Sequence, residues 1–239
     1  MTDMPHPTDA LETVRRQRLL LTALDAWLLE QVRPYLGQRI LEVGCGHSNL
    51  TAPLLSGREL VVATDQDAAS VAMVRARFPD AANLVTHTAD ITDPAVLDLA
   101  RYRLDTVVCL NVLEHIEDDT TALAHMRDLL TGGYLIVIVP ALRALYGTID
   151  RAIGHYRRYA KADLRRLIER VGLRVVALHY TNPLGALGWF VNARILRRRV
   201  PPVGQLKLFN ALTPALAWFE RHVRLPFGLS VLSVSTRTA

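Results

Sequence analysis

The chain has 239 residues, which suffices for one large domain with embellishments but not for two of ordinary size. Half of its residues are hydrophobic and 21% are charged, a composition that excludes a disordered chain. Its formal net charge of +5 suits nucleic acid, an anionic membrane surface or an acidic substrate, but the basic clusters lack the interleaved aromatic residues of single-strand binders, so we expect no nucleic-acid partner.

The start of the chain and its apolar runs bear on the compartment. The first seven residues lack the basic and then apolar pattern of a signal peptide, and no apolar run approaches the ~20 residues that span a bilayer. Cys45 and Cys109 have neither CxxC spacing nor neighbouring metal-type partners, so we expect no disulfide and no metal. These features predict a cytoplasmic protein, with attachment to the periphery of a membrane as the alternative.

Apolar residues recur at helical spacing through residues 8–32, before Pro34. We expect one or two helices there, and residues 1–38 as a helical cover over a ligand crevice or over the edge of a sheet. The arginines of this segment are interpreted as a solvated face, and a substrate contact is the less favoured alternative.

A buried strand and a glycine-rich loop share the stretch RILEVGCGHSNL, residues 39–50. The apolar run at 40–43 is typical of a strand in a parallel sheet that is covered on both faces. Gly44 and Gly46 permit positive φ and lack a Cβ, so the backbone can approach a bound ligand closely. Residues 50–55 predict a short helix, whose start points the last N–H groups of the loop at that ligand.

Strands and helices alternate through the rest of the chain. Apolar runs predict further strands at 59–64, 83–88, 104–110, 134–139, 174–181 and 229–236, with helices at 67–78, from 94, at 118–130 and at 162–171. The glycines at 132 and 133 are expected to end the helix at 118–130. This alternation predicts an α/β protein with a doubly wound, mostly parallel sheet.

Polar residues follow three of these strands. Asp65 ends the second strand, 19 residues after Gly46, where an acidic side chain can accept both hydroxyls of a ribose; capping of the next helix is the alternative. Asp90 follows the third strand, where a turn residue is one interpretation. Asn111 begins the segment NVLEHI after the fourth strand.

Two of these motifs resemble those of a known family. Glu42 to Ser48 resembles the ExGxGxG signature of class I S-adenosylmethionine-dependent methyltransferases, with Ser48 in place of the third glycine, and NVLEHI is similar to that family's fourth motif. The resemblance implies a Rossmann-like, seven-stranded sheet of order 3-2-1-4-5-7-6 with an antiparallel seventh strand. It implies S-adenosyl-L-methionine as cofactor, with Asp90 on the adenine amino group and Asn111 beside the methionine portion. The cofactor-binding residues that it predicts are Glu42, Gly44, Cys45, Gly46, Asp65, Gln66, Asp90, Ile91, Asn111 and Val112.

The segment Pro140–Lys161, here called the lid segment, interrupts the alternation after the fifth strand. Its string YGxxDxxxGHxRRY, from Tyr146 to Tyr159, resembles a group of bacterial methyltransferases, many of them associated with glycan or secondary-metabolite pathways. Adjacent arginines can bind carboxylate or phosphate, and a histidine can take a proton from a hydroxyl at neutral pH. We therefore predict His155, His115 and Tyr146 as catalytic residues, and Asp150, Arg157, Arg158 and Tyr159 as substrate-binding residues.

These assignments have structural alternatives that the sequence leaves open. His115 could instead hydrogen-bond to backbone and hold its own loop. The arginines of the lid segment could pair with Asp150 and Glu169 while its tyrosines pack the segment down.

Residues 182–228, here called the insertion, separate the sixth and seventh predicted strands. They combine apolar residues such as Leu187, Phe190 and Trp218 with an arginine triplet at 197–199. Such a composition suits a roof over a hydrophobic substrate pocket, a homodimer interface or a peripheral membrane contact, and the pocket roof is favoured.

Together these features predict a single methyltransferase domain, residues 1–239. It would move the methyl group of S-adenosyl-L-methionine in line to an oxygen of a small-molecule, glycan-linked or lipid-like acceptor, with a histidine as base. The alternative is a non-catalytic subunit of the same fold that binds a membrane or protein partner. An NAD-dependent oxidoreductase is disfavoured, because Asn49 stands at the third glycine of GxGxxG and NVLEHI would have no role.

Overall fold

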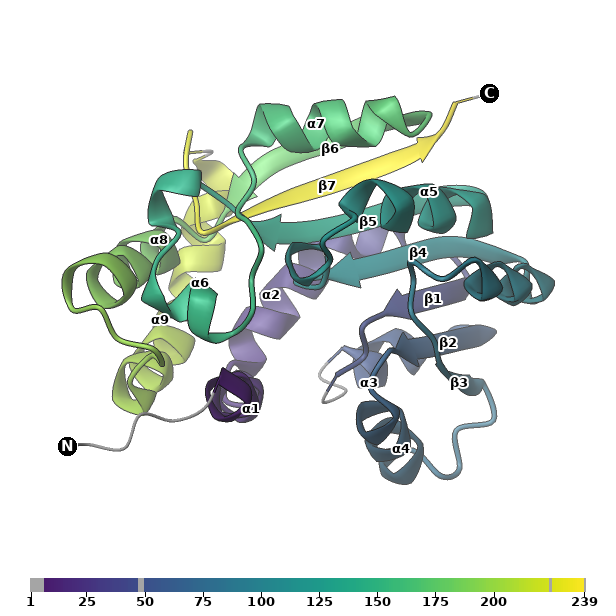
Figure 1. Cartoon of the computed structure of the whole chain (residues 1–239), viewed down its shortest axis with the longest axis horizontal. Coiled ribbons are helices and arrows are strands. Elements are labelled where there is room, and N and C mark those ends of the chain that lie inside the picture. Colours follow the sequence, from purple (N-terminus) through teal and green to yellow (C-terminus); the bar gives the residue numbers. More distant parts are fainter. Residues whose placement is uncertain (1–6, 47–49, 224, 239) are drawn as a thin grey trace.

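The computed structural model describes residues 7–46, 50–223 and 225–238. Seven strands form one sheet with the order β3-β2-β1-β4-β5-β7-β6 (Figure 1). The strands are β1 (Arg39–Val43), β2 (Leu60–Asp65), β3 (Leu84–Thr88), β4 (Leu104–Leu110), β5 (Leu130–Pro140), β6 (Leu173–Thr181) and β7 (Ser230–Arg237). β1 to β5 pair in parallel, and β7 runs antiparallel between β5 and β6. The predicted fold class and strand order are confirmed.

Helices connect the strands and cover the sheet. They are α1 (Pro7–Arg18), α2 (Thr22–Val32), α3 (Thr51–Leu55), α4 (Ala68–Arg77), α5 (Asp119–Leu129), α6 (Thr148–Ala152), α7 (Lys161–Arg170), α8 (Pro183–Phe190) and α9 (Val203–His222). The predicted helix after residue 94 is a 3₁₀ segment, Pro94–Tyr102, and Asp93 caps it by accepting a hydrogen bond from the N–H of Ala95. A five-residue π-helix, Val191–Ile195, continues α8.

The sheet is buried on both faces because its apolar runs are nearly continuous. Leu41 faces a core that α5 and α7 cover, whereas its neighbour Ile40 faces a second core that α2 and α9 cover. Burying a leucine or isoleucine side chain contributes about 1.5–3 kcal/mol. With both faces covered, the carboxyl ends of the parallel strands are left as the place where loops can surround a ligand.

β5 begins at Leu130, four residues before the predicted start, and α5 ends at Leu129. The prediction that the glycines at 132 and 133 end the helix is wrong, because both lie inside β5. The pairing of β5 with β4 shifts register between Leu104 and Thr106, which marks a bulge. Gly133 has a φ of +68°, and a Cβ there would lie 2.1 Å from the carbonyl oxygen of Asp105. Only glycine fits this bulge.

The insertion contains α8, the π-helix and α9. In Figure 1, α6, α8 and α9 gather at one end of the sheet. α9 packs against the α2 side of the core through Leu206, Phe209 and Ala217. Across the described residues, none of the helices combines the length and the apolar character that crossing a membrane requires.

Replacing Gly133 by alanine should lower the free energy of unfolding by about 1–3 kcal/mol, because the residue holds a positive φ and faces the backbone of Asp105. Urea unfolding measures this change. Gly132→Ala is the matched control: no described atom lies within 4 Å of its Cβ position, so the unfolding free energy should stay level or rise by about 0.4–1 kcal/mol. Equal effects of the two substitutions would contradict the assigned bulge.

Candidate functional site

A cavity of about 620 Å³ opens at the carboxyl ends of β1, β2 and β4. Residues of α1, α2, the lid segment and the insertion form its other walls. In an open α/β sheet this edge is where ligands bind. All ten predicted cofactor-binding residues lie on its wall, together with His115, His155 and Arg158.

The glycine loop after β1 is held by hydrogen bonds to β2. The N–H groups of Gly44 and Cys45 donate to the carbonyl oxygen of Thr64 at 2.8 and 2.9 Å. Gly44 has a φ of +74°, and a Cβ there would lie 2.3 Å from the side chain of Val112, so glycine lets the loops after β1 and β4 touch. Around Gly46 no described atom lies within 4 Å of a Cβ position. The departures from the glycine motifs, Ser48 and Asn49, lie with His47 outside the described residues.

Asp65 is fixed at the end of β2 and is 7% exposed. Its Oδ2 accepts a hydrogen bond from the N–H of Gly46 at 2.9 Å, and its Oδ1 accepts one from the N–H of Asp67 at 3.0 Å. Each carboxylate oxygen has a second lone pair for a ligand. The predicted alternative, helix capping, is met by Asp67, whose side chain accepts from Ala69 and Ser70 at the start of α4.

Asp90 and Asn111 both shape turns that border the cavity. Asp90 Oδ1 accepts from the N–H and the hydroxyl of Thr92, each at 2.8 Å, so this residue makes a turn and also lines the cavity. Asn111 has a φ of +56°, which asparagine tolerates better than most residues. Its N–H donates to the carbonyl oxygen of Ile138 at 2.8 Å, which anchors the turn on β5.

Glu42 places a buried acid at the end of β1. Its Oε2 accepts a hydrogen bond from the hydroxyl of Thr51 at 2.7 Å. Burial raises the pKa of Glu42 to about 7, although the hydrogen bond from Thr51 opposes that shift. The wall of the cavity therefore carries a carboxyl group that titrates near neutrality.

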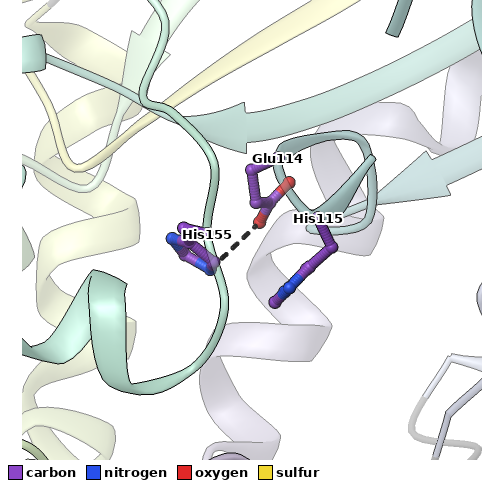
Figure 2. Close-up of side chains that lie close together, drawn as sticks. All are labelled: Glu114, His115 and His155. Carbon is purple, nitrogen blue, oxygen red and sulfur yellow. Dashed lines mark ion pairs between the residues drawn. The ribbon is translucent and has the colours of Figure 1, made fainter. Parts of the chain in front are cut away.

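Glu114, His115 and His155 form a cluster on the cavity wall (Figure 2). His155 Nε2 lies 3.8 Å from Glu114 Oε1, and the rings of His115 and His155 meet edge to face at 4.6 Å. Burial raises the pKa of Glu114 to about 7 and lowers that of His115 to about 4. The three ligand atoms lie within 4.8 Å of one another, so the cluster could share a proton or hold a metal ion.

Asp150 lies behind this cluster, fully buried and away from the cavity wall. Burial raises the pKa of Asp150, but the hydrogen bond from His155 and the charge of Arg158 outweigh burial and lower it. Its carboxylate accepts from Gly147 N at 2.9 Å, His155 Nδ1 at 3.0 Å, Arg158 Nε at 2.7 Å and Trp189 Nε1 at 3.1 Å. Asp150 is thus placed to position other side chains, and it does not line the cavity, although it was predicted as a substrate-binding residue.

Tyr146, Arg157 and Tyr159 line a second cavity of about 490 Å³ and do not line the first. Arg157 and Tyr159 both donate to Asp119 Oδ2, at 2.8 and 2.9 Å, and the hydroxyl of Tyr146 donates to the carbonyl oxygen of His155 at 2.8 Å. These contacts agree in part with the structural alternative, in which the arginines of the lid segment pair with carboxylates and its tyrosines pack the segment down. The carboxylate that the alternative also named, Glu169, pairs with Arg165 at 3.3 Å.

The structure brings Glu114 to the cavity wall, for which the sequence indicated no role of its own, and brings residues of the predicted helical cover and pocket roof there as well. Glu114 was read only as part of NVLEHI, since the burial of its carboxyl group depends on the lid segment. Trp189 lines the cavity from α8, and Leu11 and Val14 line it from α1. The helical spacing of residues 8–32 was the signal for the α1 wall, whereas nothing local to Trp189 indicates its contact with Asp150.

The unusual pKa of Glu42 predicts a pH-dependent effect on stability. In the unfolded chain the carboxyl group of Glu42 ionises near pH 4.5, whereas in the folded chain it stays protonated up to about pH 7. As pH rises through this window, ionisation therefore stabilises the unfolded chain more than the folded one, and the free energy of unfolding falls. Relative to Glu42→Gln, the unfolding free energy of the wild type should fall by about 3 kcal/mol over that window. Urea unfolding at several pH values measures the difference, and parallel pH profiles for the two proteins would contradict the assignment.

Comparisons with known proteins agree with this fold. Residues 41–135 match the family model described as a methyltransferase domain. An uncharacterized methyltransferase of Mycobacterium tuberculosis is 38% identical over 120 residues, which are 48% of this chain and 59% of that protein. A ubiquinone biosynthesis O-methyltransferase of Vibrio campbellii is 24% identical over 176 residues, which are 66% of this chain and 74% of that protein. The chain therefore spans less than two thirds of the mycobacterial relative.

The similarity extends to solved structures. The magnesium protoporphyrin IX methyltransferase of Synechocystis, with bound SAH, aligns with a TM-score of 0.56 and 18% identity, covering 100% of this chain and 90% of that chain. Likeness at this identity establishes the arrangement of strands and helices. This chain thus has the Rossmann-like methyltransferase fold, and a methyltransferase-domain match runs from β1 into β5.

Proposed function

We propose that this chain transfers the methyl group of S-adenosyl-L-methionine to a hydroxyl oxygen of a small-molecule acceptor. One observation carries the proposal: ten predicted cofactor-binding residues, at the carboxyl ends of four different strands, line one cavity together with two histidines. The family-model match at 41–135 and the relatives named methyltransferases support the reaction class. The SAH in the Synechocystis structure supports the same cofactor.

The residues around the cavity fit an adenosyl cofactor. Open space at Gly46 leaves room for close approach of a ligand to the backbone. Asp65 would hold the ribose with the lone pairs that Gly46 and Asp67 leave free. Asp90 would receive the adenine amino group through its Oδ2, because its Oδ1 already binds Thr92, and Ile91 would pack on the ring.

When bound, the cofactor supplies an activated methyl group on a sulfonium, so the chain has to align an acceptor, exclude water and remove one proton. Alignment alone can contribute about 7–11 kcal/mol. Apolar side chains of α1, α2 and the lid segment, among them Leu11, Leu24 and Ile153, line the cavity and would exclude water around the acceptor. The same walls, with Trp189 and Leu206 from the insertion, suit an acceptor that has an apolar portion.

We assign removal of the proton from the acceptor hydroxyl to His155. Asp150 accepts from its Nδ1 at 3.0 Å, which leaves Nε2 as the acceptor nitrogen. His115 is a poor base, because burial lowers its pKa to about 4. Arg158, which pairs with Asp150, places a positive charge beside the cluster of Glu114, His115 and His155. Because that charge disfavours a second cation there, we assign the cluster to proton transfer rather than to a metal ion. Tyr146, bound to the carbonyl oxygen of His155, is a positioning residue.

Asp65→Ala should weaken the binding of S-adenosylhomocysteine by about 1–3 kcal/mol, because hydrogen bonds to a charged acceptor are lost. Calorimetric titration of the purified chain measures it. Asp93→Ala is the matched control, since Asp93 is an exposed acid that caps Pro94–Tyr102 and lies off the cavity. Unchanged affinity after Asp65→Ala would remove the ribose assignment, and binding of NADH in place of S-adenosylhomocysteine would indicate an oxidoreductase.

His155→Ala should lower turnover about 10²–10⁴-fold while affinity for S-adenosylhomocysteine is retained, because a base acts on the acceptor and not on the cofactor. The acceptor is first found by incubating labelled cofactor with cell extracts and identifying the methylated product by mass. His87→Ala is the control, since His87 binds Tyr102 away from the cavity. Dialysis against a chelator should leave turnover unchanged.

Two results would contradict these assignments. Turnover at the wild-type level after His155→Ala would return His155 to a structural role, and loss of turnover on chelation would assign the cluster to a metal. Tight cofactor binding with no methyl transfer to any acceptor would favour the non-catalytic alternative.

A further inference from the structure

The insertion carries most of the exposed large hydrophobic side chains of the described chain. Thirteen of them belong to residues 182–228, and the remaining five are Leu19, Leu20, Met73, Tyr156 and Val176. The thirteen are Leu184, Leu187, Phe190, Val191, Ile195, Leu196, Val203, Leu208, Leu212, Trp218, Phe219, Val223 and Phe227. Scattered exposed apolar residues are ordinary, but a concentration of this kind in one segment indicates a surface that another body covers.

α9 has two apolar stripes on opposite sides. One stripe, which includes Leu206, Phe209 and Ala217, packs on the α2 side of the core. The other follows Leu208, Leu212 and Phe219 at helical spacing, and these side chains are 62%, 44% and 41% exposed. A helix that needed only to cover the core would be polar on this second face.

The charge of the chain is concentrated in the same segment. The insertion contains seven lysine and arginine residues and one acid, Glu220, so its formal charge is +6, whereas the whole chain carries +5. Glu220 is buried and accepts from the N–H of Asn182, which turns the acid inward. Arg194, Arg197 and Lys207 are exposed next to the apolar residues. The outer surface of the insertion is therefore apolar and basic.

We propose that the insertion docks on an anionic membrane surface, with the exposed stripe of α9 and the neighbouring residues of α8 in the interfacial layer and the basic side chains on lipid headgroups. An amphipathic segment of this kind gains from apolar burial and from attraction to anionic lipids, each lysine or arginine near the surface adding to the binding. A second copy of the chain fits less well, because a self-complementary interface would bring two strongly basic surfaces together.

The insertion also forms part of the cavity wall. Trp189, Pro201 and Leu206 of the insertion line the cavity wall, and their neighbours Phe190 and Val203 are exposed. Since the insertion both docks and lines the cavity, an acceptor with a lipid-like portion suits this site. This last step rests on the proposed methyl transfer, whereas docking itself does not.

Vesicle binding by the purified chain, without any methyl-transfer assay, tests docking. The chain should bind phosphatidylcholine vesicles that contain phosphatidylglycerol about ten-fold or more tightly than vesicles of phosphatidylcholine alone, and added salt should weaken the binding. Trp218 is 65% exposed on α9 and flanks Phe219 of the exposed stripe, so brominated lipids should quench the fluorescence of the wild type, and Trp218→Phe should remove most of the quenching. This readout requires no destabilising substitution.

Two double variants separate the apolar and basic contributions. Leu208→Gln with Leu212→Gln, and Arg197→Gln with Lys207→Gln, should each weaken binding to the anionic vesicles about ten-fold or more. Met73→Gln, which like Leu212 is 44% exposed on a helix, and Arg165→Gln with Arg166→Gln on α7 should leave it unchanged. Absence of vesicle binding would overturn the proposal, as would equal losses in the control variants. A stable dimer that does not bind vesicles and that Leu208→Gln with Leu212→Gln dissociates would assign the face to a second copy.

Discussion

The carboxylate of Asp150 accepts hydrogen bonds from the start of α6, from two residues further along the lid segment and from α8 in the insertion. Arg158, bound to it, also donates to the carbonyl oxygen of Ala141 at 3.0 Å and lies over the ring of Trp189 at 4.7 Å. One buried charge thus joins the end of β5, the lid segment and the insertion. The orientation of His155 toward Glu114 follows from this arrangement.

Because Asp150 and Arg158 are buried, each of the two charges depends on the other. An ionised carboxylate and a guanidinium are costly to remove from water, and removing one partner of a buried pair leaves a charge whose isolation costs about 3–5 kcal/mol. The backbone adds a further link, because the N–H of Tyr156 donates to the carbonyl oxygen of Glu114 at 2.9 Å. The lid segment is therefore tied to the turn after β4 by its main chain as well as by the contact of His155 with Glu114. One ligand atom from each of Glu114, His115 and His155 lies within 4.8 Å of the others.

The sheet was predictable from sequence because strands covered on both faces leave long apolar runs, and the strand order followed from the family resemblance. Asp65 could be placed because a strand end fixes where a side chain emerges. Asp150 could not be placed in the same way: a polar string does not reveal whether its side chains face a ligand or one another, and the partners of Asp150 include Trp189, 39 residues away. The pair of glycines in β5 suggested a helix end because a bulge and a helix end both select glycine for its positive φ, which Gly133 adopts here.

Trp189 links the buried cluster to the outer surface of the molecule. Its Nε1 donates to Asp150, while the next residue, Phe190, is 44% exposed and Leu187 is 58% exposed on the same short helix. α8 continues into the π-helix, where the carbonyl oxygen of Ala193 accepts from the hydroxyl of Thr148 at the start of α6. One helix thus carries both exposed apolar residues and a donor to Asp150, so the surface proposed for docking and the residues that orient His155 share one element.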